Sequence, residues 1–129
     1  MKLLISLDTQ IPSGKNSIKE SWRDGKKVRH GNDRFTVWRE TAGKEILMQK
    51  SQWPTATKMA LPLTGDLIMT VSYRPLDKTQ RDLTGMTDAL FHVLETMELI
   101  ENDGQIKGLT WVYPWRTDGP CVMMEIRGA

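Results

Sequence analysis

The chain has 129 residues, of which 39% are hydrophobic and 26% charged, and its formal net charge is +2. These values predict one globular domain that can bury a core without disulfides. One cysteine and two histidines exclude an intramolecular disulfide, a multi-cysteine zinc site and a metal site built on histidines.

No apolar run approaches the roughly 18 residues that are typical of a membrane span. The apolar run that follows Met1 is also too short for a secretory signal. We therefore expect a cytoplasmic protein that makes no membrane contact.

The first half of the chain predicts a strand, a hairpin and a helix. Lys2–Leu7 is a short apolar run suited to a strand, and a loop containing Pro, Gly and Asn follows it. Asp24-Gly25 is typical of a hairpin turn, here between short strands within Ser21–Arg29. Asp33 is a candidate N-cap for a helix over Arg34–Gln52. The apolar stripe of that helix is Phe35, Trp38, Ala42, Ile46 and Met48.

The second half predicts a strand, a clear helix and two final strands. Apolar residues alternate along Asp66–Tyr73, as in a half-buried strand. The next helix has an apolar stripe at three- and four-residue spacing. That stripe is Leu83, Met86, Leu90, Val93, Leu94 and Met97. After a tight turn, Gln105–Val112 and Cys121–Ile126 are expected as strands joined by a hairpin loop. We expect an α+β fold, a mixed β-sheet with two main α-helices packed on it, in a small single domain.

Charge is distributed unevenly along the sequence. Residues 82 to 104 contain no Lys or Arg and six acids, whereas Pro12–Arg39 has eight basic residues and three acids. The six acids are Asp82, Asp88, Glu95, Glu98, Glu101 and Asp103. A basic surface beside a carboxylate site suits a polyanion whose phosphates are held by cations and cleaved at a metal. A solvated acidic helix face and a basic loop without a ligand remain the structural alternative.

Two of the acids flank the second helix. Asp82 stands at its entrance and Asp103 in the turn after its exit. If the chain folds back over the helix, both carboxylates can approach one site, and carboxylates are usual ligands of Mg²⁺. Each acid also has a purely structural explanation, because Asp is a common helix N-cap and a common turn residue.

Several short motifs occur together in this order. They are the loop Pro12-Ser-Gly-Lys-Asn16, the helix start Arg81-Asp82-Leu83-Thr84-Gly85, the helical Asp88-Ala89-Leu90 and the turn Asn102-Asp103-Gly104-Gln105-Ile106. In these motifs the chain resembles the RusA-like family of Holliday-junction resolvases, over about residues 5 to 126. The specificity of the resemblance rests on the helix and the turn that follows it. It implies one RusA-like nuclease domain over residues 1–129, bacterial or phage-encoded.

The resemblance implies roles for individual residues. Asp82 matches the first catalytic Asp of the family, and Asp103 matches the Asp of the turn after the helix. The family's second Asp falls at Thr84 and its helical Lys at Asp88, so the chain departs from the pattern there. Thr84 and Asp88 share a helix face, and we expect Asp88 to take over part of the ligand set. A degenerate site, or a solvated Asp88, is the alternative.

The function implied by the resemblance is Mg²⁺-dependent cleavage of branched DNA by a homodimer, with Mn²⁺ as a substitute for Mg²⁺. Asp82, Asp103 and Asp88 would be the metal ligands and Arg81 would assist at the scissile phosphate. The residues expected to bind branched or duplex DNA are Lys15, Asn16, Lys19, Lys26, Lys27 and Arg29. The alternatives are a non-catalytic DNA-binding or accessory protein on the same fold and an RNA-directed nuclease.

Overall fold

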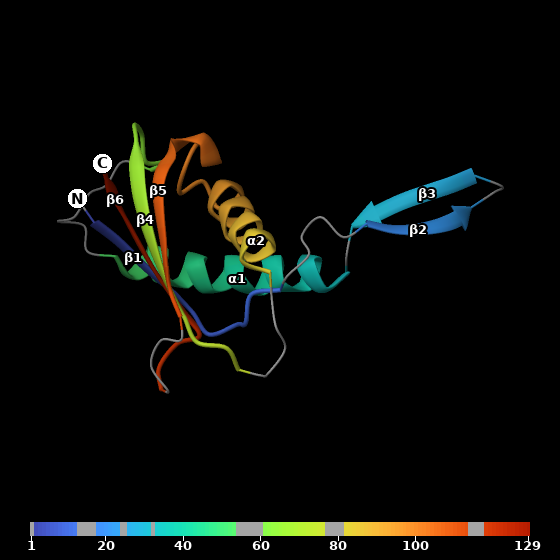
Figure 1. Cartoon of the computed structure of the whole chain (residues 1–129), viewed down its shortest axis with the longest axis horizontal. Coiled ribbons are helices and arrows are strands. Elements are labelled where there is room, and N and C mark those ends of the chain that lie inside the picture. Colours follow the sequence, from blue (N-terminus) through green and yellow to red (C-terminus); the bar gives the residue numbers. More distant parts are fainter. Residues whose placement is uncertain are drawn as a thin grey trace.

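The structure is a computed structural model that describes residues 2–12, 18–23, 26–31, 33–53, 61–76, 82–113 and 118–129. Its elements are β1 Lys2–Leu7, β2 Ile18–Arg23, β3 Lys26–Gly31, α1 Asp33–Gln52, β4 Leu67–Tyr73, α2 Leu83–Thr96, the 3-10 helix η2 Asp103–Gln105, β5 Ile106–Val112 and β6 Val122–Gly128. A mixed sheet packs against two helices (Figure 1). The expected α+β fold is confirmed.

The sheet has the strand order β1-β6-β4-β5. Strand β6 is antiparallel to both β1 and β4, whereas β4 and β5 are parallel. Parallel neighbours need a crossover connection, and α2 lies in the one between β4 and β5. The predicted hairpin between the last two strands is therefore wrong, because β4 lies between β5 and β6.

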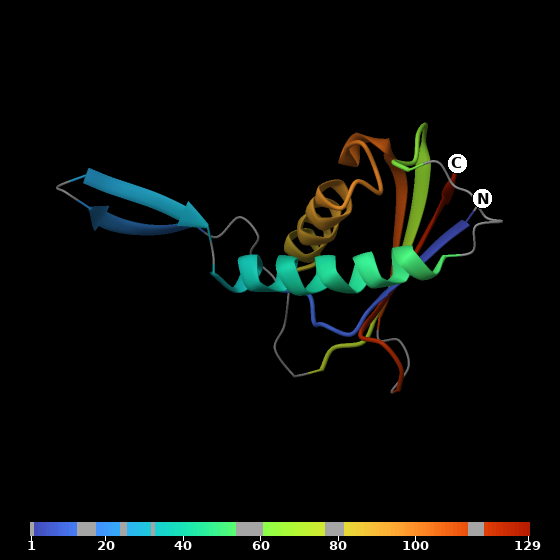
Figure 2. The same ribbon diagram turned by 180° about the vertical axis from the view of Figure 1, so that it is seen from behind.

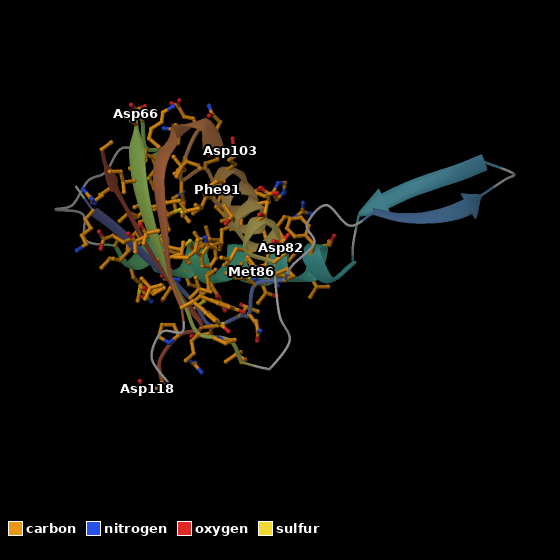
Figure 3. The ribbon with its side chains drawn as sticks, in the orientation of Figure 1. Asp66, Asp82, Met86, Phe91, Asp103 and Asp118 are labelled. Atoms are coloured by element: carbon orange, nitrogen blue, oxygen red, sulfur yellow. The ribbon has the colours of Figure 1, made fainter. Side chains whose placement is uncertain are left out.

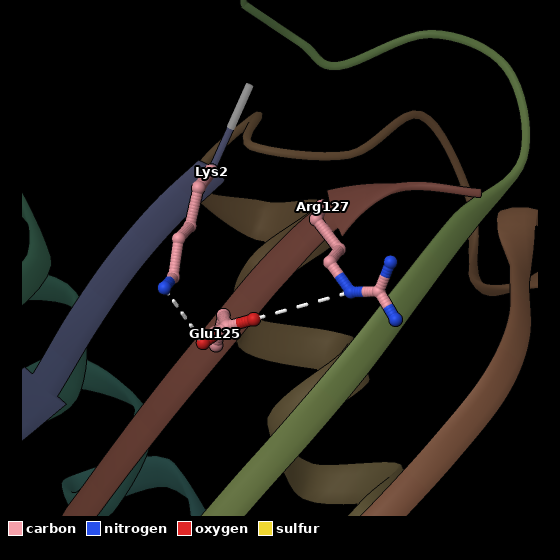
Figure 4. A network of polar contacts seen from close by, with 3 residues as sticks. All are labelled: Lys2, Glu125 and Arg127. Carbon is pink, nitrogen blue, oxygen red and sulfur yellow. Dashed lines mark ion pairs between the residues drawn. The ribbon is translucent and has the colours of Figure 1, made fainter.

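One face of the sheet is buried and the other is open. The buried residues alternate along β1, β4 and β6, as expected for strands with one covered face. The core lies between this face and the two helices. On the open face, the Glu125 carboxylate forms two ion pairs (Figure 4). Its Oε2 is 3.3 Å from Nζ of Lys2, and its Oε1 is 4.0 Å from Nε of Arg127. These half-exposed pairs contribute little to stability.

The predicted apolar stripes of the helices are largely confirmed. Most of the α2 stripe is buried, as are the first four residues of the α1 stripe. Met48 is the exception in α1, with 66% of its surface exposed, and Leu83 at the start of α2 is 49% exposed. Cys121 is a free, buried cysteine.

A two-stranded hairpin stands apart from the sheet. Strands β2 and β3 pair only with each other, with Ile18 opposite Gly31 and Arg23 opposite Lys26. Figures 1 and 2 show this hairpin extending outward beyond the start of α1. The expected pairing of two strands is confirmed, with strands longer than predicted. The predicted turn Asp24-Gly25 lies outside the described residues. No helix among the described residues is long and apolar enough to cross a membrane.

Candidate functional site

Asp82 is the N-cap of α2. Its backbone is extended (φ −70°, ψ 122°), and its Oδ1 accepts a hydrogen bond from the backbone N–H of Thr84 at 3.1 Å. An N-cap carboxylate satisfies an amide that has no partner inside the helix and lies at the positive end of the helix dipole. Asp82 is exposed.

Asp103 begins η2, at the other end of α2. Its backbone N–H donates to Oε1 of Glu95 at 2.7 Å, which ties the turn to the last helical turn of α2. The Asp103 side chain is exposed. The role of Glu95 in holding this turn was not predicted from the sequence.

The turn that carries Asp103 is held by Gln105, a buried polar residue. Its Oε1 accepts from the backbone N–H groups of Glu101 at 2.7 Å and Asn102 at 3.1 Å. Its Nε2 donates to the backbone oxygens of Leu63 at 2.8 Å and Gly65 at 3.1 Å. One amide thereby fixes the turn against the segment that precedes β4.

The structure does not bring Asp82 and Asp103 together within one chain. Asp82 caps the first turn of α2, whereas Asp103 is hydrogen-bonded to Glu95 at the last. The 14 residues of α2 separate them by roughly 20 Å at 1.5 Å per residue, and Figure 3 shows them at opposite ends of the helix. The expectation that the chain folds back to join them is wrong, because η2 leads directly into β5.

Asp88 lies between these two ends on the helix surface that includes His92, one turn further on. His92 contacts α1: its ring packs edge-on to Phe35 at 5.3 Å between centroids, and its Nε2 is 3.4 Å from Nη1 of Arg39. Asp88 is half-buried and has an interaction partner. It is six residues from Asp82, a rise of about 9 Å along the axis. The contact of His92 with α1 was not predicted from the sequence.

These positions do not form a Mg²⁺ site in one chain. Among the described residues, no three side chains of His, Cys, Asp or Glu gather closely enough to hold a metal ion. Mg²⁺ needs ligands at about 2.0–2.1 Å, so a single ion cannot contact both Asp82 and Asp103 across the length of α2. The predicted three-carboxylate set does not fit the ion within one copy of the chain.

The residues expected to bind DNA fall into two groups. Lys19 lies on β2, and Lys26, Lys27 and Arg29 lie on β3, so all four belong to the projecting hairpin. The other expected contacts, Lys15 and Asn16, lie outside the described residues, as does Arg81.

An aromatic group at the carboxyl ends of β4 and β5, formed by Tyr73, Trp111 and Tyr113, was not predicted from the sequence. Tyr113 is 61% exposed and stacks on Tyr73, with 5.8 Å between ring centroids and 20° between planes. Tyr73 also packs edge-on to Trp111, whose Nε1 donates to Oγ1 of Thr87 in α2. The carboxyl ends of parallel strands are a usual ligand-binding edge. The parallel pairing of β4 and β5, had it been anticipated, would have pointed to this edge.

Neither models of protein families nor curated proteins gave a significant match to this chain. The resemblance to the resolvases therefore rests on the motifs themselves. Of those motifs, the structure places the helix start and the turn at the two ends of α2.

Proposed function

We propose that this protein is a Mg²⁺-dependent endodeoxyribonuclease that cleaves branched DNA, the four-way junction first. The observation that carries the proposal is a basic hairpin on the same chain as an exposed capping carboxylate. Strands β2 and β3 contain five basic residues and one acid, and Asp82 is exposed at the start of α2. A polyanion held by the first could present a phosphate to the second. A cytoplasmic location in a bacterial or phage-infected cell belongs to the same proposal.

The hairpin would hold DNA through its phosphates. Lys19, Lys26, Lys27 and Arg29 supply positive charge on an arm that extends from the body. Contacts to phosphate position the protein and give affinity without reading base sequence. Lys15, Asn16 and Arg81 would add contacts near the hairpin and near Asp82.

The separation of the two acids makes the homodimer an essential part of this proposal. Asp82 and Asp103 could share one ion only if Asp103 came from a second copy. A two-fold axis would create two such sites, each combining one acid from either copy, and two sites suit two cuts in a junction. Mg²⁺, or Mn²⁺ in its place, would be held there with water and phosphate completing its ligands.

A mixing experiment tests the shared site. Asp82→Asn and Asp103→Asn should each abolish Mg²⁺-dependent nicking of a synthetic junction. Equal amounts of both variants should recover about a quarter of wild-type nicking, because half of the dimers are mixed and each has one intact site of two. If the mixture stays inactive while its mixed dimers form, the two acids do not act together across copies. Duplex, single-stranded and RNA substrates serve as controls.

A non-catalytic DNA-binding or accessory protein is the second candidate. The observation that favours it is that Asp82 already has a structural role as N-cap and is distant from Asp103. This candidate predicts junction binding that is unaffected by Asp82→Asn and no nicking with Mg²⁺ or Mn²⁺. The wild-type cleavage assay separates the two candidates directly.

A further inference from the structure

The two outer edges of the four-stranded sheet differ in how they are covered. At β1, side chains of α1 bond the outward backbone: the Gln49 amide donates to the Ser6 oxygen at 2.6 Å and accepts from the Ser6 N–H at 2.8 Å. Oε2 of Glu45 accepts from the N–H of Asp8 just beyond the strand at 3.2 Å. These contacts occupy the outward backbone of this edge around Ser6 and Asp8.

The β5 edge has no such cover from the part of the chain that the structure describes. Its residues pair with β4 on one side, and no described residue makes a hydrogen bond to the backbone of the other side. Figure 1 shows β5 and α2 nearest the viewer, and Figure 2 shows α1 there instead. Within the described part of the chain, the backbone groups of β5 on the side away from α1 are therefore unpaired.

The exposed side chains at this edge are mainly apolar. Leu109, Val112 and Tyr113 are 37%, 41% and 61% exposed, and the strand contains one charged residue, Lys107. Natural edge strands are usually protected by charge, proline, a bulge or a covering element. In β5, a bulge at Lys107 is one such protection against pairing with another strand. An open, apolar edge of this kind favours pairing with another strand.

We propose that β5 pairs antiparallel with β5 of a second copy across a two-fold axis, which joins the two sheets into one of eight strands. The sequence of the edge suits a second copy because it is self-complementary. The bulge leaves Gly108–Val112 as the regular part of β5, with Thr110 at its centre. An axis at Thr110 places Leu109 opposite Trp111 of the second copy, Val112 opposite Gly108, and Thr110 opposite itself. Leu109 of each copy then gains an apolar partner in Trp111 of the other, whereas Val112 faces a glycine.

Helix α2 extends the same surface. Thr87 accepts a hydrogen bond from Trp111 of β5, so this side of α2 lies over the edge strand. Leu83 and Phe91 lie four residues to either side of Thr87 and share its face; Leu83 is 49% exposed and Phe91 is half-buried. Across the axis the two α2 helices would run antiparallel, with their dipoles in a favourable opposition.

This arrangement would also direct Asp82 of one copy toward the Asp103 end of the other. That consequence rests on the proposed function, whereas the pairing of β5 does not. Dimer formation can therefore be measured without DNA or metal, and a protein that does not cleave DNA could still form the dimer.

A charge-swap experiment tests the pairing. Thr110 is exposed, so Thr110→Glu and Thr110→Lys should fold normally, which circular dichroism checks. In each variant like charges would face each other across the axis, which should weaken the dimer about tenfold or more. An equal mixture should regain dimers, because Glu then faces Lys. Sedimentation velocity measures these states against the 14.8 kDa mass of one chain.

Leu4 provides the matched control, since it is 51% exposed on the other edge strand. Leu4→Glu and Leu4→Lys should leave the dimer unchanged. A wild-type protein that stays monomeric at its highest soluble concentration would overturn the proposal. So would dimers that survive both Thr110 variants, or a mixture that associates no better than either variant alone.

Discussion

Gly43 of α1 lies directly against Met97, the C-cap of α2. A Cβ atom built on Gly43 would be 3.2 Å from the sulfur of Met97, closer than ordinary van der Waals contact. Glycine in the middle of a helix is intrinsically unfavourable, and Gly43 weakens the helical pattern of the sequence. The absence of a Cβ atom on Gly43 leaves room for the Met97 sulfur at the end of α2.

The first prediction concerns this contact. Gly43→Ala should raise the free energy of unfolding by up to about 1 kcal/mol, because alanine is the better helix former and the flexible Met97 side chain can shift by a few tenths of an ångström. Gly43→Val should lower it by about 1–3 kcal/mol, since a branched side chain overpacks the contact. Urea denaturation measures both. Equal losses for the two variants would mean that Met97 cannot move.

The second prediction concerns Gln105, which makes four hydrogen bonds to backbone groups of two segments. Gln105→Ala should lower the free energy of unfolding by about 2–3 kcal/mol, because it leaves these groups without their partner. Gln52→Ala, at the exposed end of α1, is the matched control and should change it by less than about 0.5 kcal/mol. A similar loss for both variants would contradict the role assigned to Gln105.

The third prediction separates the two roles of Asp82. Asp82→Asn should keep the N-cap and leave stability nearly unchanged, because Asn caps as well as Asp. Nicking of a junction should nevertheless be lost. Asp82→Ala should lose nicking and also about 1 kcal/mol of stability. Asp66→Asn, a change at an exposed acid before β4, should affect neither quantity. Full nicking by Asp82→Asn would reduce Asp82 to a helix cap.

Much of the fold was predictable because its signals are local. The α2 stripe and the alternation in β4 depend on the spacing of neighbouring residues, and both are confirmed. The order of strands in the sheet is not local. β5 and β6 follow each other in sequence with a turn-rich connection, and nothing within either strand indicates that β4 lies between them.

The candidate site also combines features that local sequence signals predict with a distance that they do not. The sequence correctly placed Asp82 at the entrance of α2 and Asp103 in the turn after it. It could not give the distance between them, which depends on where the chain goes after α2. The turn continues into β5 beside β4, so the length of the helix remains between the two acids.

The fourth prediction concerns the hairpin. Replacing Lys26, Lys27 and Arg29 with Ala should weaken binding to all DNA sequences alike. Each lost phosphate contact should reduce the slope of log affinity against log salt by about one. Titrations at several salt concentrations measure this slope. Lys44→Ala with Lys50→Ala on α1 is the control and should leave it unchanged; an unchanged slope for the hairpin variant would place the DNA elsewhere.

The fifth prediction concerns Asp88, which stands where the resolvase pattern has a cation. If Asp88 supplies an oxygen that Thr84 cannot, Asp88→Ala should reduce nicking most strongly at limiting Mg²⁺. Thr84→Asp added to that variant should restore part of the activity, because positions 84 and 88 lie one turn apart on the same face. Restoration should be incomplete, since Mg²⁺ requires near-octahedral geometry. Glu40→Ala, at an exposed acid of α1, is the control. If Asp88→Ala cuts junctions normally at limiting Mg²⁺, Asp88 is not a metal ligand. It would then be only a surface residue of α2, one turn before His92, which contacts Phe35 and Arg39 of α1.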